Sequence, residues 1–142
     1  MNIYFACSIT GGRELESVYQ VIVQTLTEDG HEVPTAHLAE SEVAALEAVI
    51  SPRDVYARDV AWISACDALV AEVSVPSHGV GYEIGFALRL GKPVLALYQD
   101  GRKVSKMISG NPDLYLQVYA YHNTIEASSR VREFLSQIGD AL

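Results

Sequence analysis

The chain has 142 residues, of which 49% are hydrophobic, and its formal net charge is −8. This length suits a single domain over residues 1–142 with a full core, and no apolar run approaches the roughly 20 residues of a membrane-spanning helix. The acidic balance argues against a nucleic-acid polymer as partner, because proteins that bind one usually carry a basic surface. We therefore expect a soluble globular protein that binds a small ligand and has no contact with a membrane.

The two cysteines, Cys7 and Cys66, provide neither a disulfide framework nor the spacing of a metal site. The first residues, MNIYFACSITGG, lack both the basic segment and the small-residue cleavage site of a signal peptide, so they are interpreted as a first strand. Both observations favour a reducing, cytoplasmic location. No metal site is expected from the cysteines.

Apolar runs alternate with helical patterns along the chain. The predicted strands cover residues 2–7, 31–35, 68–73, 94–98 and 115–121, and the predicted helices cover 15–26, 52–66, 82–90, 104–109 and 123–138. The polar stretch 36–47 is a long connection with room for a turn or two of helix. The alternation indicates an α/β three-layer sandwich, doubly wound and flavodoxin-like or Rossmann-like, with a five-stranded, mostly parallel sheet. Its expected strand order is 2-1-3-4-5.

In this order the loops after the first and third strands face one crevice at the carboxyl ends of the strands, where open α/β sheets bind ligands. The first loop, CSITGGR, contains Gly11 and Gly12 between Ser8 and Arg13. Its backbone N–H groups, one hydroxyl and one cation could bind a phosphate. An ordinary strand-to-helix turn is the commoner reading of a lone Gly-Gly loop, and the loop matches neither a Walker motif nor the dinucleotide fingerprint.

Two carboxylates are expected to converge beside these loops. Glu83 follows Gly79 and Gly81, which allow a ligand to approach closely, although the helix dipole alone also favours an acid in a first turn. Asp59 falls on the apolar face of the helix over 52–66, where an acid is costly unless it is paired, for example with Arg58. Two carboxylates near an anion-binding loop suit glycosidic chemistry, in which one acts as nucleophile or base and the other assists proton transfer.

Three further side chains have common structural explanations. His37 and His78 lie in polar loops, where histidines are more often surface residues than catalysts. Tyr4 lies in the first strand, where a tyrosine usually belongs to the core. No Ser–His–Asp pattern is visible, and no metal site is supported.

Three segments resemble a known family. They are YFACSITGGRE at 4–14, RDVAWISACDALVAEVSVPSHGVGYEIG at 58–85 and VSKMISG at 104–110. They look like the 2'-deoxynucleoside 5'-phosphate N-hydrolases, relatives of the nucleoside 2-deoxyribosyltransferases, and the resemblance covers nearly the whole chain. It implies a cofactor-independent hydrolase that splits the N-glycosidic bond of a deoxynucleoside monophosphate into free base and 2-deoxyribose 5-phosphate. It also implies a doubly wound fold assembled as a homodimer.

The resemblance implies roles for three catalytic side chains. Glu83 matches the family's nucleophile, which attacks the anomeric carbon and forms a glycosyl-enzyme ester. Asp59 matches the acid that assists at the sugar and with protons. Tyr4 matches the tyrosine beside the 2' position of the sugar, where it disfavours a ribose hydroxyl.

The resemblance also implies which residues bind the substrate. Ser8 and Ser77 match phosphate-binding serines, and Ser105 matches a serine that reaches the phosphate from the neighbouring subunit. His37 aligns with a histidine near the mouth of the active site. The glycines of both loops and Arg13 complete the expected substrate-binding set.

Two positions depart from the family pattern. Cys7 stands where the family commonly has Gly, and Thr10 stands where it commonly has Arg, so a planar phosphate donor is missing. Phosphate affinity should be weaker unless Arg13 or a residue of the partner chain compensates, and an unphosphorylated nucleoside would then be tolerated. The alternative functions are a deoxyribosyltransferase, which passes the sugar from the same glutamyl intermediate to a second base, and a nucleotide-binding sensor without turnover.

Overall fold

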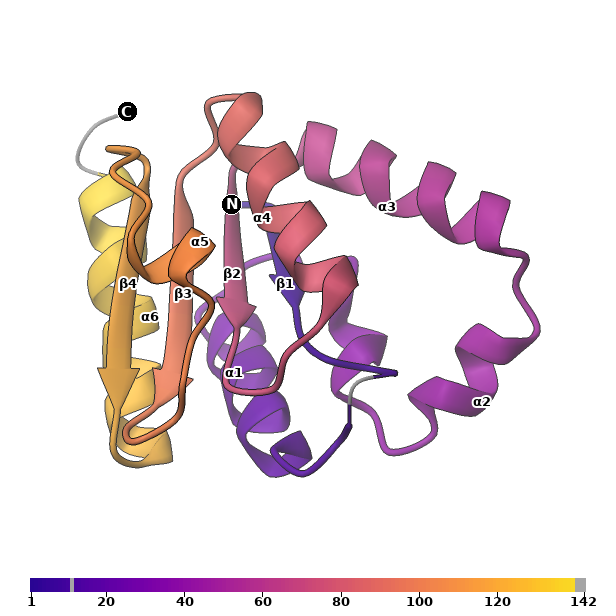
Figure 1. Ribbon diagram of the computed structural model, residues 1–142, viewed down its shortest axis with the longest axis horizontal. Coiled ribbons are helices and arrows are strands. Elements are labelled where there is room, and N and C mark those ends of the chain that lie inside the picture. Colours follow the sequence, from indigo (N-terminus) through magenta and orange to yellow (C-terminus); the bar gives the residue numbers. More distant parts are fainter. Residues whose placement is uncertain (11, 140–142) are drawn as a thin grey trace.

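A computed structural model of the chain, described for residues 1–10 and 12–139, shows a parallel sheet with helices on both faces (Figure 1). The strands are β1 (Ile3–Ala6), β2 (Ala68–Glu72), β3 (Val94–Gln99) and β4 (Leu116–Tyr121). They lie in the order β1-β2-β3-β4, and each neighbouring pair is parallel. The helices are α1 (Glu16–Glu28), α2 (Val43–Ala48), α3 (Pro52–Ala65), α4 (His78–Arg89), α5 (Lys106–Ser109) and α6 (Thr124–Gly139), with a 3₁₀ helix η1 (Ala36–Ala39).

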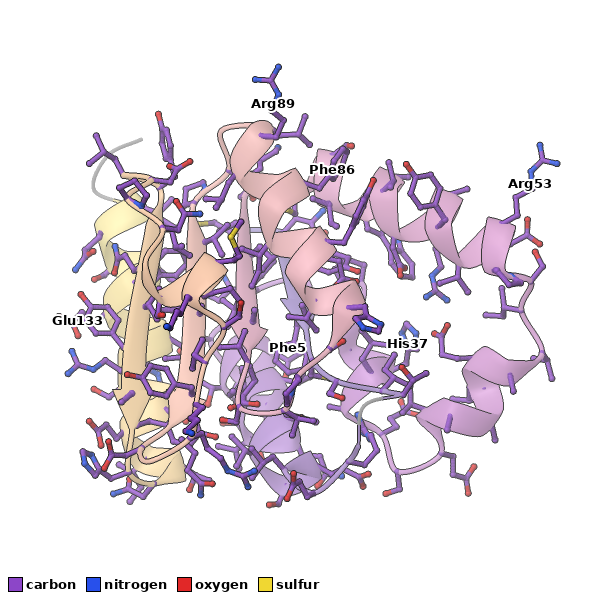
Figure 2. All side chains as sticks on the ribbon, in the orientation of Figure 1. Phe5, His37, Arg53, Phe86, Arg89 and Glu133 are labelled. Atoms are coloured by element: carbon purple, nitrogen blue, oxygen red, sulfur yellow. The ribbon has the colours of Figure 1, made fainter. Side chains whose placement is uncertain are left out.

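Two apolar layers hold these helices on the sheet. The layer under α1 and α6 contains Phe5 and Leu95, and the layer under α3 and α4 contains Leu69. Strands β1 and β2 are buried along their whole length, as expected of parallel strands covered on both faces. Figure 2 shows Phe5 within the body of the molecule, whereas the exposed side chains of Arg53 and Arg89 extend from it. The α/β sandwich with a parallel sheet is therefore confirmed.

The prediction of five strands is wrong, because the segment expected to be the second strand makes only an isolated bridge beside β1. There the Ile3 N–H group donates to the carbonyl of Glu32 at 2.8 Å. The ladder stops because Pro34 has no N–H group, and the Phe5 N–H group donates instead to the side-chain hydroxyl of Thr35 at 2.8 Å. The segment lies at the edge where the predicted order places it, and the sheet has four strands.

Helix α4 begins at His78, four residues earlier than predicted. The Ser77 hydroxyl caps it by accepting a hydrogen bond from the Val80 N–H group at 3.3 Å. Glu83 therefore lies in the second turn, and the first turn of α4 contains no acidic residue. Since the effect of the helix dipole on an acid falls off after the first turn, it does not account for this carboxylate.

A buried carboxyl group closes the end of β2 on the side of α1 and α6. Glu72 is fully buried and accepts hydrogen bonds from the Ser74 hydroxyl and, at 3.1 Å, from the Tyr121 hydroxyl. The Ser74 hydroxyl in turn accepts from the Gln99 N–H group at 2.7 Å. Burial raises the pKa of Glu72. The network ties the loop after β2 to the ends of β3 and β4, and that loop leads into α4.

Both cysteines are buried free thiols, at 4% exposure for Cys7 and 1% for Cys66.

Over residues 1–10 and 12–139, no helix combines the length and the apolar character required to cross a membrane.

Candidate active site

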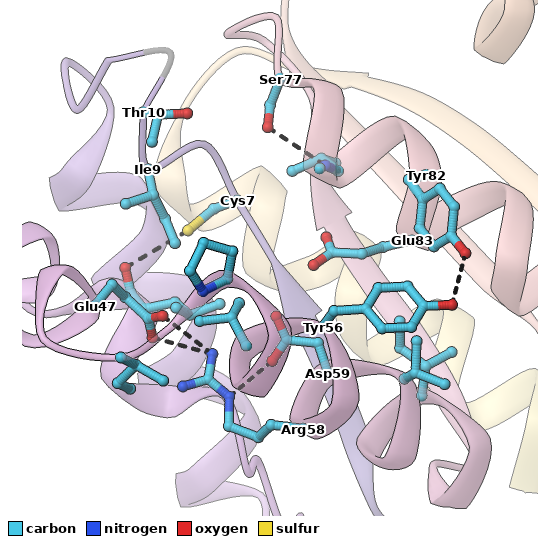
Figure 3. Close-up of a pocket in the computed structure, with 18 residues that line it drawn as sticks. Cys7, Ile9, Thr10, Glu47, Tyr56, Arg58, Asp59, Ser77, Tyr82 and Glu83 are labelled. Carbon is cyan, nitrogen blue, oxygen red and sulfur yellow. Dashed lines mark hydrogen bonds and ion pairs between the residues drawn. The ribbon is translucent and has the colours of Figure 1, made fainter.

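A cavity of about 530 Å³ opens beyond the carboxyl end of β1. It lies between the loop after β1, the first turns of α4, and α2 and α3, which extend away from the β1 edge of the sheet (Figures 1 and 3). Among its lining residues are Cys7, Ile9, Thr10, Glu47, Val55, Tyr56, Arg58, Asp59, Ser77, Gly79, Tyr82 and Glu83. The crevice expected at the ends of the strands thus exists, and it holds both predicted carboxylates.

Glu83 is joined to the sheet by one short hydrogen bond. The Tyr4 hydroxyl, fully buried on β1, donates to Glu83 Oε1 at 2.7 Å. Burial raises the pKa of Glu83 to about 7, with a further upward contribution from the charge of Asp59, while the Tyr4 hydrogen bond and the charge of Arg58 oppose the rise. Burial and the Glu83 charge also raise the pKa of Tyr4, so its hydroxyl stays protonated as a donor. Tyr4 therefore orients a carboxyl group that titrates near neutrality.

Asp59 projects from α3 into the same cavity and is ion-paired. Arg58 Nε lies 2.9 Å from Asp59 Oδ1. Burial raises the pKa of Asp59, and the hydrogen bond and charge of Arg58 act against that rise. The pairing with Arg58, which the sequence left open, is therefore present, and Asp59 also lines the cavity.

The N-terminus of α4 forms the side of the cavity opposite the loop after β1. Ser77 and Gly79 line it, with Thr10 across from them (Figure 3). An N-terminal helix turn offers backbone N–H groups to an anion. A Cβ atom added at Gly79 would lie 3.9 Å from Ser77 Oγ, an ordinary van der Waals contact, so this turn has room for a side chain without a clash. Ser8 is fully buried, and its hydroxyl has no hydrogen-bond partner within residues 1–10 and 12–139.

Arg13 lies outside the cavity wall and has other partners. Its guanidinium donates to the carbonyl oxygens of Leu38 at 2.7 Å and Glu40 at 2.9 Å, and it lies 5.2 Å from the centre of the Tyr19 ring. Gly12 takes φ +130°, a conformation that side chains rarely adopt, and so allows the loop to turn toward α1. Gly11 lies outside the described residues. Arg13 thus fastens η1 to the loop after β1 instead of reaching the site.

His37, Gly81 and Ser105 also lie off this wall. His37 Nε2 is 2.8 Å from Glu47 Oε1. Gly81 and Ser105 line a second cavity, of about 530 Å³, between α4 and α5. The Ser105 hydroxyl accepts a hydrogen bond from the Met107 N–H group at 3.3 Å. Within one chain, the structure does not bring Ser105 to the carboxylates.

Sequence analysis did not single out three polar residues that line the cavity, namely Glu47, Tyr56 and Tyr82. The Tyr56 and Tyr82 hydroxyl oxygens are 3.3 Å apart, and both residues are more than half exposed, at 56% and 54%. Their positions offer a signal, since Tyr56 lies one helical turn before Asp59 and Tyr82 directly precedes Glu83. Glu47 offers none, because its helix α2 lies in the polar stretch that the sequence leaves unassigned.

This arrangement supports nucleophilic and acid–base chemistry by carboxyl groups. One carboxyl titrates near neutrality beside a phenol donor, and the other is held by a guanidinium, so their environments differ as such pairs require. Across residues 1–10 and 12–139, no group of three His, Cys, Asp or Glu side chains could hold a metal ion.

Comparison with known sequences identifies relatives over most of the chain. A relative from Methanosarcina barkeri, provisionally named 2'-deoxynucleoside 5'-phosphate N-hydrolase 1, is 42% identical over 134 residues, which cover 94% of this chain and 84% of the relative. The 5-hydroxymethyl-dUMP N-hydrolase of Mus musculus is 45% identical over 116 residues, covering 79% of this chain and 66% of the mouse protein.

Two solved structures share the fold. The solution structure of BlsM superposes with a TM-score of 0.78 at 20% identity, covering 98% of this chain and 91% of BlsM. The CMP N-glycosidase BcmB of Clostridium botulinum gives 0.69 at 21% identity, covering 93% of this chain and 99% of BcmB. At these identities the likeness concerns the fold alone. The sequence model described as nucleoside 2-deoxyribosyltransferase matches residues 3–132, and with relatives above 40% identity this shows that the chain belongs to that family.

Proposed function

We propose that this protein hydrolyses the N-glycosidic bond of 2'-deoxynucleoside 5'-monophosphates and releases free base and 2-deoxyribose 5-phosphate. The observation that carries the proposal is the 2.7 Å hydrogen bond from the Tyr4 hydroxyl to the partly buried Glu83 carboxyl, in a cavity that also holds Asp59. Relatives named as N-hydrolases of deoxynucleoside monophosphates support the substrate class.

The proposed reaction has two steps at the anomeric carbon. In the first, an ionised oxygen of Glu83 bonds to C1' while the C1'–N bond breaks, and its electron pair leaves with the base, which gains a proton. Positive charge develops on the sugar as the base departs, and a carboxylate in contact with the ring stabilises it. In the second, water attacks C1', loses a proton, and releases Glu83. Asp59 serves the proton transfers, and Tyr4 holds Glu83 so that its other oxygen is free to attack.

The phosphate is proposed to lie at the N-terminus of α4. Ser77 and the backbone N–H groups of the first turn would bind it, with Thr10 and Ser8 on the opposite loop. Because Arg13 is engaged with carbonyl oxygens and Thr10 is neutral, this part of the site lacks a guanidinium. We therefore expect weaker phosphate binding than in relatives that carry an arginine at the Thr10 position.

A homodimer is proposed as the active form. Within one chain, Ser105 lines the second cavity and not the cavity that holds both carboxylates, although Ser77 lines both. The resemblance to the family implies that Ser105 serves the phosphate at the site of a neighbouring copy. Sedimentation at assay concentration should show dimers, and a fully active monomer would contradict this arrangement.

Base release followed by chromatography tests the proposed function. The substrates are dGMP, dCMP, dTMP, GMP and deoxyguanosine, each assayed with and without a second free base. We expect release from the deoxynucleoside monophosphates and little from GMP. Base exchange that far outruns hydrolysis would instead indicate a transferase, and tight binding with no release would indicate a sensor.

The Tyr4→Phe variant should show its effect in the pH profile. Glu83 must be ionised to attack, so kcat/KM of the wild-type protein should fall as the pH drops through about 7. The Tyr4 hydrogen bond lowers the pKa of Glu83, and removing it should move this acidic limb to higher pH. At neutral pH the loss should be about 10- to 100-fold, the range of a hydrogen bond to a charged group. An unchanged profile would mean that Tyr4 does not stabilise the ionised carboxylate.

A further inference from the structure

Arg58 is held between two carboxylates that belong to different helices. Its Nε lies 2.9 Å from Asp59 on α3, and its Nη2 lies 3.1 Å from Glu47 Oε1 on α2. The guanidinium carbon is 4.9 Å from the centre of the Trp62 ring. The guanidinium thus contacts two carboxylates and one aromatic ring, and Figure 3 shows the two ion pairs meeting at it.

The pair formed by Arg58 and Asp59 is unusual for a helix. Neighbouring residues on an α-helix point in directions about 100° apart, so side chains at positions i and i+1 do not face each other. Arg58 must fold back across the helix to reach Asp59. Besides the Trp62 ring, the Glu47 carboxylate is a further contact that holds the long, flexible Arg58 side chain in that conformation.

Glu47 is itself well fixed. Its side chain is 12% exposed, and its Oε1 atom also lies 2.8 Å from His37 Nε2. The contacts of Glu47 join η1, α2 and α3. Helix α2 has six residues, of which only Val43 is buried, so these polar contacts are a large part of what holds it beside α3.

We propose that Glu47 is a positioning residue for Asp59: it holds the Arg58 guanidinium against the Asp59 carboxylate and thereby fixes the direction and the charge of Asp59 in the cavity. The inference rests on the proposed N-hydrolase function, since it assigns Glu47 a part in the same site. Glu47 touches neither sugar nor base in this scheme and acts through Arg58.

The direction in which the pKa values of Asp59 and Glu83 move on replacing Glu47 distinguishes the positioning role from the effect of its negative charge alone. The titratable and charged groups that face Asp59 are Arg58 on α3, Glu47 on α2, His37 on η1, Glu83 on α4 and Tyr4 on β1. As a bare negative charge, Glu47 raises the pKa of Asp59. As the anchor of Arg58 it has the opposite effect, because Arg58 lowers the pKa of both Asp59 and Glu83.

The test compares Glu47→Gln with Glu42→Gln. Glu42 is a matched control, since it is exposed and its side chain makes no hydrogen bond within residues 1–10 and 12–139. For Glu47→Gln we expect kcat for base release to fall about 10-fold, the order of a weakened charged hydrogen bond, with KM within about 3-fold. The acidic limb of the pH profile should move to higher pH. Glu42→Gln should match the wild-type protein in both.

A double variant tests whether Glu47 acts through Arg58. Arg58→Lys keeps the charge, but a lysine cannot bind two carboxylates with a planar fork, so its acidic limb should also move to higher pH. Added to Arg58→Lys, the Glu47→Gln change should cost less than about 2-fold, because the interaction it supports is already lost. Full additivity of the two losses would overturn the inference.

Further outcomes are equally decisive. A Glu47→Gln protein with an unmoved or lowered acidic limb, or with a loss of melting temperature and no loss of kcat, would overturn the positioning role while leaving the proposed function intact. Should Glu47→Gln fail to fold by circular dichroism, Arg58→Lys decides alone, and an unchanged pH profile in that variant overturns the inference. Absence of base release by the wild-type protein from every deoxynucleoside monophosphate would overturn the function and the inference together.

Discussion

Replacing Glu83 by glutamine should reduce kcat for base release on the order of 10⁴-fold, which corresponds to about 5.4 kcal/mol of activation free energy. The change removes the nucleophile but keeps a side-chain oxygen that can accept the Tyr4 hydrogen bond, so KM should change little. Steady-state chromatography of the released base measures both constants. A variant that keeps more than about a tenth of the wild-type kcat would exclude Glu83 as nucleophile.

The same variant should be more stable than the wild-type protein at high pH. The pKa of Glu83 is about 7 in the folded chain against an ordinary 4.5, so between these values unfolding releases a proton, and the free energy of unfolding falls as the pH rises. Glutamine does not titrate. Its advantage should therefore grow from pH 4.5 to 7 and then level off, at roughly 3 kcal/mol or less. Denaturant unfolding measures this difference. If Glu83→Gln changed the free energy of unfolding equally at pH 5 and pH 8, burial would not raise the pKa of Glu83 in the folded chain.

The Asp59→Asn change should have the second largest effect. Loss of an acid–base group typically costs about 10²- to 10⁴-fold in rate. Asp59 also raises the pKa of Glu83 through its charge, so its removal should move the acidic limb of kcat/KM to lower pH. This direction is opposite to that expected for Tyr4→Phe. Measuring the two pH profiles side by side would therefore distinguish the Asp59 carboxylate, which disfavours the negative charge on Glu83, from the Tyr4 hydroxyl, which stabilises that charge.

Asp54→Asn is the matched control for Asp59→Asn. Asp54 lies in the first turn of the same helix, is exposed, and is absent from the cavity wall. Its replacement should leave kcat within about 2-fold and the pH profile unchanged, since an exposed surface charge has little effect at this distance. If Asp54→Asn shifted the profile as Asp59→Asn does, the effect would reflect the net charge of α3 and not a group in the site.

Most of the fold could be predicted because its signals are local. The four strands of the sheet follow from apolar runs, and α1, α3 and α6 follow from apolar residues at helical spacing. Asn123 directly precedes α6, and its side-chain oxygen caps the helix by accepting a hydrogen bond from the Glu126 N–H group at 2.9 Å. The Glu126 carboxylate accepts a hydrogen bond from the His122 N–H group. The predicted second strand does not form, because the Phe5 N–H group of β1 donates to the Thr35 hydroxyl and not to a backbone carbonyl. This is a contact between distant segments, so the local sequence gives no sign of it.

The candidate site was predictable only in part. The convergence of Glu83 and Asp59 follows from topology, because the ends of parallel strands and the helices after them meet at one edge. The contacts of Glu47 and Arg13 do not follow from it, since both cross the polar stretch, whose path over the sheet is set by tertiary contacts. Residue type suggested that Arg13 would meet a phosphate, whereas its place beside η1 gives its guanidinium two carbonyl oxygens.

The weak anchoring of α3 has a consequence for local unfolding. Ile63 is the only fully buried residue of this 14-residue helix, and Val55, Tyr56 and Asp59 all face the open cavity. Helices with few buried contacts open at a small free energy, and a ligand that binds only the closed form suppresses that opening. Amide hydrogens of α3 should therefore exchange with solvent faster than those of α1 in the empty protein, and slow down when a nucleotide fills the cavity. Substrate would thus complete the packing of the helix that carries Asp59.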